Sequence, residues 1–334
     1  MKNSSMGYYF IVTASIFIVF AGIKSASEIV VPFLLSLFLA IILIPSYNYL
    51  NRKNLPHILS LIIVMGVFVI LISLVGKLIG SSAVEFNTKL DFYTQQLNSY
   101  FIAFVNFMSK IGVDISSQEL SALVHPKQIM SFSGTVLASL TNMFSNGFVV
   151  LFTVIFMLLE SDNFTKKLSD FKTDQEQVSH LEEITGKIKE YMVLKTLISA
   201  LTGIIIWIGL LIIGTDYAFL WAVIAFLFNF IPNIGSIIAA VPVVLLTLIQ
   251  LGSLSAVAVA IMYTAINIII GSIVEPKVMG NGLGLSPLVV FLSLIFWGWL
   301  LGIVGMFLSI PLTIMLKIIL DSNTNTKRFG NLLG

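Results

Sequence analysis

Two long stretches of this chain carry no charged side chain, one between Asp216 and Glu275 and the other between Lys277 and Lys317. The hydrocarbon core of a bilayer is ~30 Å thick, and an α-helix crosses it in about 20 residues. Each stretch is too long for one crossing and must hold several crossings or broken ones. The sequence therefore predicts an all-α polytopic integral membrane protein.

The composition supports this prediction and excludes other classes. Hydrophobic residues make up 57% of the chain and charged residues 10%, whereas soluble domains carry about 25% charged residues. The net charge of +2 gives no argument for a nucleic-acid partner. Cysteine is absent and the three histidines lie in separate segments, so we expect no metal site and no cofactor.

The apolar segments predict about seven or eight membrane segments, with broken or re-entrant helices in the C-terminal half. A proline is expected to end the second segment at Pro45. The apolar segments are 8–23, 29–44, 58–79, 136–159, 196–213, 219–231, 234–249, 256–274 and 288–319.

Lysine and arginine in short loops favour the cytoplasmic side of a membrane. Basic residues follow the second apolar segment at Arg52 and Lys53, the fourth between 166 and 195, and the last near Lys317. Placing them in the cytoplasm predicts a cytoplasmic N-terminus and an external segment 81–133. Segment 288–319 must then enter and return, and its glycines Gly298, Gly302 and Gly305 allow such a hairpin.

The resulting organisation has six parts. They are N-terminal transmembrane helices (1–81), an extracytoplasmic amphipathic insert (82–135), a transmembrane helix (136–160), a cytoplasmic helical insert (161–195), a transport core with interrupted helices (196–320) and a cytoplasmic tail (321–334).

In the outer insert, apolar residues alternate in steps of four and three, which is typical of a helix that packs against another helix. These residues are Phe86, Leu90, Tyr93, Leu97, Tyr100, Phe104, Phe107 and Ile111. We favour a packing surface here over a helix that lies on the membrane. In the inner insert, an apolar stripe over 178–191 predicts a helix that continues into the next segment through Lys195.

A first candidate site is the break around Pro232. Proline lacks an amide proton and clashes with the preceding turn, so a helix stops or kinks there and backbone carbonyls are freed. Asn229 and Asn233 flank the break and add donors and acceptors, and Gly235 follows. Broken helices of this kind bind solutes or cations in secondary transporters. The alternative is a proline kink whose freed groups the two asparagines satisfy.

A second candidate site follows an apolar run directly at Glu275, Pro276 and Lys277. Ionisable residues at a membrane boundary are functional candidates. Glu275 could take up a proton, pair with Lys277, or simply mark the water interface. The turn that follows contains three glycines, which suit a hinge or gating loop. They are Gly280, Gly282 and Gly284.

Two further features concern the same region. Gly235 precedes Pro242 much as Gly305 precedes Pro311, each after an aromatic-rich run, which is a weak indication of an internal repeat with a site between its halves. Asn267 lies within an apolar pass, where an amide either joins helices or lines a cavity. We keep it as a candidate substrate-binding residue.

The sequence lacks the motifs of intramembrane and nucleotide-hydrolysing enzymes. It contains no His-Glu-x-x-His, no Gly-x-Ser-x-Gly and no Walker A loop. We therefore expect that the protein is not an enzyme, and that any active transport draws its energy from an ion or solute gradient across the membrane.

Several segments resemble the autoinducer-2 exporter family of bacterial inner-membrane proteins. They are FIPNIGSIIAAVP (230–242), VEPKVMG (274–280), LSPLVVFLSLIFWGWLLG (285–302), YMVLKT (191–196) and EIVVPF (28–33). The resemblance implies transport of a small, polar, uncharged signalling molecule by a homo-oligomer, with a pentamer among its expected sizes. Other branches of the family resemble cation/proton antiporters, so the resemblance does not fix the substrate.

Three functions follow as hypotheses. The first is export or facilitated passage of the quorum-sensing signal autoinducer-2, with Asn229, Asn233, Asn267, Glu275 and Lys277 in contact with the substrate. The second is a sodium or lithium/proton antiporter in which Glu275, with Asp216, exchanges ions. The third is a non-transporting membrane assembly subunit that works through the outer seam and the inner charged helix.

Overall fold

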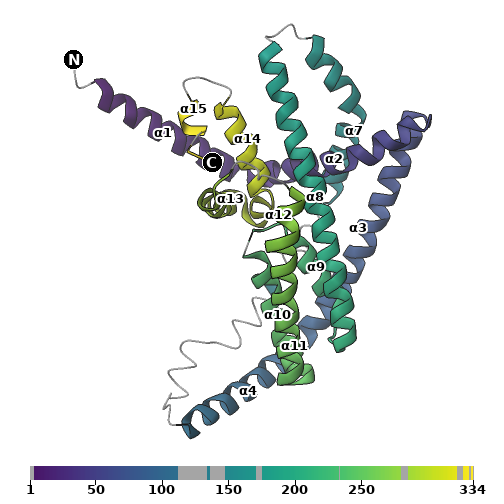
Figure 1. The fold of residues 1–334 in the computed structure, drawn as a ribbon, viewed down its shortest axis with the longest axis vertical. Helices are drawn as coiled ribbons and strands as arrows, with labels where there is room; N and C mark the ends of the chain where they lie inside the picture. The colour runs from purple at the N-terminus through teal and green to yellow at the C-terminus, as the bar shows by residue number, and fades with distance from the viewer. Residues whose placement is uncertain are drawn as a thin grey trace.

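The computed structural model describes residues 4–111, 134–135, 147–170, 175–232, 234–279, 285–321, 326–330 and 332–333. Every regular element in this part of the chain is a helix, as predicted (Figure 1). Five helical stretches are long and apolar enough to cross a membrane: Ser27–Arg52, His57–Thr88, Gly186–Ile213, Ser253–Val278 and Pro287–Phe307. The count of seven or eight crossings stays a prediction.

The N-terminal part consists of α1 (Ser4–Ser25), α2 (Ser27–Arg52) and α3 (His57–Thr88). The prediction that Pro45 ends the second segment is wrong, because α2 continues through both Pro32 and Pro45. Packing holds the helix together on both sides of Pro45. Ala40 before it and Tyr47 after it are buried in one cluster with α3 and with α7 (Gly147–Asp170).

The outer seam is divided between two helices. Helix α3 runs past residue 79, where the apolar segment was expected to end, and α4 (Leu90–Lys110) begins after a break at Lys89. Phe86, Tyr93 and Leu97 are buried in the main core of the molecule. The second half of the seam is exposed, at Tyr100, Phe104, Phe107 and Ile111. The packing interpretation is therefore confirmed within the chain for the first half only.

Helix α8 (Gln175–Ile213) joins the inner insert to the membrane segment without a break at Lys195, as predicted. It packs against the short helix α9 (Ala218–Phe228), which lies beside it in Figure 1. Residues 136–146 of the expected fourth segment lie outside the described residues.

The predicted break at Pro232 is present. Helix α9 ends at Phe228, a turn follows, and α10 begins at Gly235 and ends at Leu251. Each helix is shorter than the ~20 residues that a full crossing needs. An added Cβ at Gly235 would meet the backbone carbonyl oxygen of Phe228, so only glycine lets the two helices approach so closely.

The next helix changes its winding along its length. Helix α11 (Ser253–Ile266) passes into a π-helix, η1 (Asn267–Val274), and then into α12 (Glu275–Met279). A π-helical segment has i→i+5 hydrogen bonds, is rare, and occurs frequently at functional sites. Here it begins at Asn267 and ends directly before Glu275, two of the predicted site residues.

The C-terminal part consists of α13 (Pro287–Phe307), α14 (Ser309–Asp321) and α15 (Lys327–Gly330), and the chain folds back on itself inside α13. Trp297 Nε1 donates a hydrogen bond of 3.0 Å to Thr313 Oγ1. In one straight helix these residues would be separated by roughly 24 Å, at 1.5 Å per residue. The reversal takes place after Gly302, whose φ of 67° and ψ of −150° are glycine-specific.

The main core joins α3, α4 and α8–α11 with parts of α13. Figure 1 shows α8, α10 and α11 running side by side, with α4 projecting away from one end of this group, α2 crossing α8, and α1 extending away to the side. Asn229 directly follows α9, and Asn267 and Glu275 lie on the helix that continues α11.

Candidate functional site

A pocket lies between α8, α9, α10 and the α11–η1 helix. The empty space there, open solvent included, is about 320 Å³, of which the enclosed part is about the size of one water molecule. It is lined by Thr202, Ile206, Ala225, Asn229, Ser236, Ala239, Tyr263, Ile266, Asn267, Ile270 and Gly271. The broken-helix asparagine Asn229 and the mid-pass asparagine Asn267 thus meet in one pocket, although they are far apart in the sequence.

Asn229 is held in place by a neighbouring helix. Its Nδ2 donates a hydrogen bond of 2.9 Å to Oγ of Ser199, which is fully buried on α8. This contact leaves the amide oxygen as an acceptor for another group. The turn around Asn229 also pairs some of its own backbone groups. The Ile231 amide donates to the Phe228 carbonyl oxygen, and the Gly235 amide donates to the Ile231 carbonyl oxygen. The break thus presents a side-chain amide more than free carbonyls.

Two hydroxyl groups in the pocket have no hydrogen-bond partner among the described residues. They belong to Tyr263, which is 4% exposed, and to Ser236, whose oxygen is buried. A buried hydroxyl without a partner costs about 1–3 kcal/mol. Asn267, in contrast, is exposed at the open side. The pocket therefore offers neutral donors and acceptors among apolar side chains, which suits an uncharged polar solute.

A buried ion pair lies one helical turn from the pocket. Nζ of Lys195 on α8 donates a hydrogen bond of 2.5 Å to Oε1 of Glu275 at the start of α12. The Lys195 side chain is 4% exposed and that of Glu275 20%. The phenolic oxygen of Tyr191, one turn before Lys195, is buried with no hydrogen-bond partner in the part of the chain that the structure describes, and it interacts with the charge of Glu275.

The pocket and the ion pair share the same two helices. Polar residues recur on α8 at Tyr191, Lys195, Ser199 and Thr202. On the neighbouring helix they recur at Tyr263, Asn267 and Glu275. A spacing of three or four places residues on one helical face. The sequence reasoning missed Lys195, Ser199, Thr202, Ser236 and Tyr263. The regular spacing of polar residues in apolar helices was the signal that would have indicated most of them.

Other predictions about this region have mixed outcomes. The suggested pairing of Glu275 with Lys277 is wrong, because Glu275 faces Lys195 while Lys277 and Pro276 are exposed. The helix geometry explains this outcome, since residues two apart point to different sides. Asn233, Gly280, Gly282 and Gly284 lie outside the described residues.

The expected hinges also differ from one another. Pro232 lies in the turn between α9 and α10, as predicted, whereas Pro242 is buried inside α10 without ending it. Pro311 lies in the first turn of α14, where its missing N–H costs little. Of the suggested internal repeat, only the two glycines have similar surroundings in the structure. An added Cβ at Gly235 or at Gly305 would meet the carbonyl oxygen of Phe228 or of Trp297, respectively. Gly298 is similarly close to the Met306 side chain.

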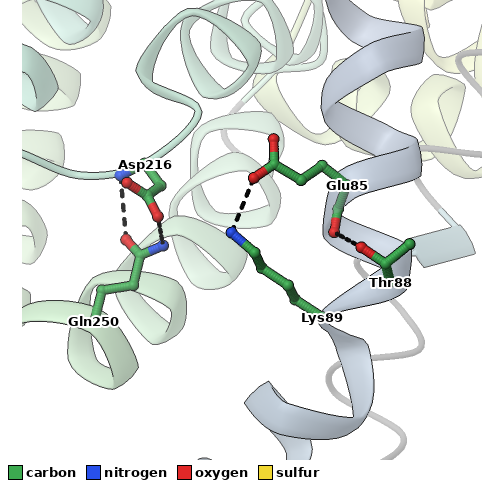
Figure 2. A network of polar contacts seen from close by, with 5 residues as sticks. All are labelled: Glu85, Thr88, Lys89, Asp216 and Gln250. Atoms are coloured by element: carbon green, nitrogen blue, oxygen red, sulfur yellow. Dashed lines mark hydrogen bonds and ion pairs between the residues drawn. The ribbon is translucent and has the colours of Figure 1, made fainter.

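A second polar network lies at the far end of α8. Figure 2 shows the pair Glu85–Lys89, at the α3–α4 corner, facing Asp216 and Gln250. Gln250 Nε2 donates to Oδ2 of Asp216 at 2.7 Å, and the Asp216 amide donates back to the Gln250 side chain at 3.1 Å. The hydrogen bond that Lys89 donates to the Glu85 carboxylate raises the pKa of Lys89 above its ordinary value. Such exposed pairs contribute little to stability.

This network separates the two carboxylates of the antiporter hypothesis. Asp216 follows the C-terminal end of α8, about 20 residues beyond Lys195 and so roughly 30 Å along the helix axis, at 1.5 Å per residue. The structure therefore does not bring Asp216 to Glu275, and they form no joint ion site.

Comparison with known proteins gives consistent matches over nearly the whole chain. The family model described as AI-2E family transporter matches residues 10–325. The chain is 39% identical over 317 residues to the AI-2 transport protein TqsA of Escherichia coli, covering 95% of this chain and 92% of that protein. It is 40% identical to a putative transport protein of Haemophilus influenzae, covering 96% of this chain and 94% of that protein. The putative transport protein YhhT of Escherichia coli is 33% identical, with 96% and 92% covered.

Proposed function

Because this chain belongs to the AI-2E family of transporters, a family of multi-pass membrane proteins, we propose that it moves autoinducer-2 across the bacterial inner membrane. In this proposal it acts as an exporter or facilitator for a small, polar, uncharged molecule. The substrate is suggested by the relative from Escherichia coli whose name states AI-2 transport.

The pocket around Asn229 and Tyr263 carries this proposal. It combines an amide, two unpartnered hydroxyl groups and apolar walls, and its lining residues carry no formal charge. A hydroxylated solute can pair with these groups and replace water without bringing a charge into the membrane. The pocket lies beside the broken helix pair α9–α10 and the π-helix η1, which are the irregular elements on which transporters build such sites.

Flux measurements test the proposal. Purified protein is reconstituted in liposomes, and release of autoinducer-2 is compared for wild type, Asn229→Ala and Thr264→Ala. Losing one neutral hydrogen bond of about 1 kcal/mol lowers the flux at low substrate concentration by roughly fivefold. Thr264 is the matched control, since it lies on the same helix as Tyr263 but is exposed and bonds only to its own helix.

The outcomes separate the site from the function. No flux through correctly assembled wild-type protein would refute autoinducer-2 transport. Equal flux through wild type and Asn229→Ala would refute the pocket as the substrate site and leave the transport function standing.

A further inference from the structure

The ion pair between Lys195 and Glu275 has no part in the substrate contacts described above, yet it is the most deeply buried pair of charges among the described residues. Ionisable residues inside membrane segments are costly and are retained mainly where they serve transport. In ion-coupled transporters, a carboxylate beside the substrate site binds the proton or cation. In this protein the ammonium group of Lys195 already lies at the Glu275 carboxylate, where such a cation would bind.

Lys195 occupies the space beside the Glu275 carboxylate. Its ammonium group hydrogen-bonds the Glu275 carboxylate directly and is almost completely enclosed. Among the described residues, Lys195 contacts this carboxylate and Tyr191, one turn earlier on α8, interacts with its charge. The preceding π-helix, Asn267–Val274, contributes no charged residue, and Lys277 is exposed. A small cation bound at Glu275 would have to displace the ammonium group.

We propose that Lys195 is a built-in counter-ion that occupies the place of a coupling cation or proton at Glu275, so that this transporter works without ion coupling. The inference rests on the proposed function, because it concerns how that transport is driven. It also follows from the position of the pair. Ser199 lies four residues after Lys195, and Gly271 lies four residues before Glu275. An unpaired charge there would be about 6 Å along the axis from a pocket that suits uncharged solutes.

The first test measures accumulation in proteoliposomes. A carrier that moves one proton per substrate accumulates substrate about tenfold for each pH unit of gradient. We expect wild-type protein to equalise autoinducer-2 across the membrane, with no accumulation under a proton, sodium or lithium gradient. Accumulation driven by any of these gradients would overturn the proposal.

The second test needs no substrate. Thermal unfolding of purified protein is measured in sodium, lithium or choline chloride over a range of pH, for wild type, Lys195→Met and the double variant Lys195→Met/Glu275→Gln. Wild type should be indifferent to the cation. Lys195→Met should be stabilised by sodium or lithium or by a fall in pH, because either neutralises the unpaired carboxylate. The double variant should lose this response.

The variants keep the two proposals distinguishable. Lys195→Gln, which can still hydrogen-bond the carboxylate but carries no charge, serves in place of Lys195→Met where the latter does not fold. Unfolding temperatures that respond to neither cations nor pH in the single variant would overturn the counter-ion role. Absence of autoinducer-2 flux in wild type would instead refute the proposed substrate, while the thermal data still decide the role of Lys195.

Discussion

At the scale of single residues, the pocket is notable for polar atoms that the protein itself leaves unpaired. Tyr263 and Ser236 have buried oxygens without partners among the described residues, whereas Asn229 is hydrogen-bonded to Ser199. Natural structures pair almost all buried polar groups, and the exceptions generally have a reason. A transient ligand is such a reason, because it supplies the missing partner only while it is bound.

Tyr263→Phe should therefore separate stability from function. Removing an unpaired buried hydroxyl eliminates a cost of about 1–3 kcal/mol, so the unfolding temperature should stay equal or rise. Loss of a substrate contact should lower autoinducer-2 flux by about three- to tenfold. Unfolding temperature and flux are measured on the same preparation. A fall in stability with unchanged flux would show that the hydroxyl serves packing instead.

At the scale of elements, the sequence predicted the helices well where long-range packing only reinforces the local pattern. The uncharged stretches, the continuous helix through Lys195 and the break at Pro232 all follow from composition and from proline chemistry. The prediction failed at Pro45, because tertiary contacts of Ala40 and Tyr47 hold α2 together across the proline. Local rules contain no information about such contacts.

The candidate site was predictable only in part, for the same reason. Asn229, Asn267 and Glu275 are conspicuous because they are polar residues in apolar segments of the sequence. The structure places the first two in one pocket. Lys195 was taken for a boundary residue, since nothing local shows that it meets a carboxylate eighty positions later. Pairings between distant helices require the fold.

The turn in the C-terminal hairpin gives a prediction about an element. Gly302→Ala should destabilise the protein by about 1–3 kcal/mol, because the backbone there has a conformation that only glycine adopts readily. Gly80→Ala is the control, since an added Cβ meets nothing within 4 Å and the residue lies inside α3. It should be neutral or stabilising by about 0.5–1 kcal/mol. Thermal unfolding monitored by size-exclusion chromatography provides the comparison; equal effects of the two substitutions would contradict the expectation.

At the scale of the whole molecule, the absence of cysteine makes the predicted orientation directly testable. Positions Lys53 and Ser99 are both exposed and lie on opposite sides of the membrane in the predicted topology. In intact spheroplasts, a membrane-impermeant thiol reagent should label Ser99→Cys and leave Lys53→Cys unlabelled until the membrane is opened. The reverse pattern would refute a cytoplasmic N-terminus.

The apolar surface of the molecule is consistent with a membrane environment and with proposed self-association. Large aliphatic and aromatic side chains are exposed along α3 and along the outer half of α4, such as Ile70, Phe104 and Phe107. Lipid covers such residues on a membrane span. On α4, which lies beyond the main helix group, a second copy of the chain is the proposed cover.

The π-helix η1 sets the rotational phase of everything that follows it. Because it accommodates one more residue per turn than an α-helix, deleting one residue, for example Ile269, would allow the segment to close into regular α-helix. Residues beyond the deletion would then keep nearly their place around the axis, because the lost residue and the tighter winding compensate one another. Glu275 would still face Lys195. Such a deletion variant should be as indifferent to sodium and lithium as wild type, and a response like that of Lys195→Met would contradict this. The winding of this short helix thus keeps Glu275 on the side of its helix that faces Lys195.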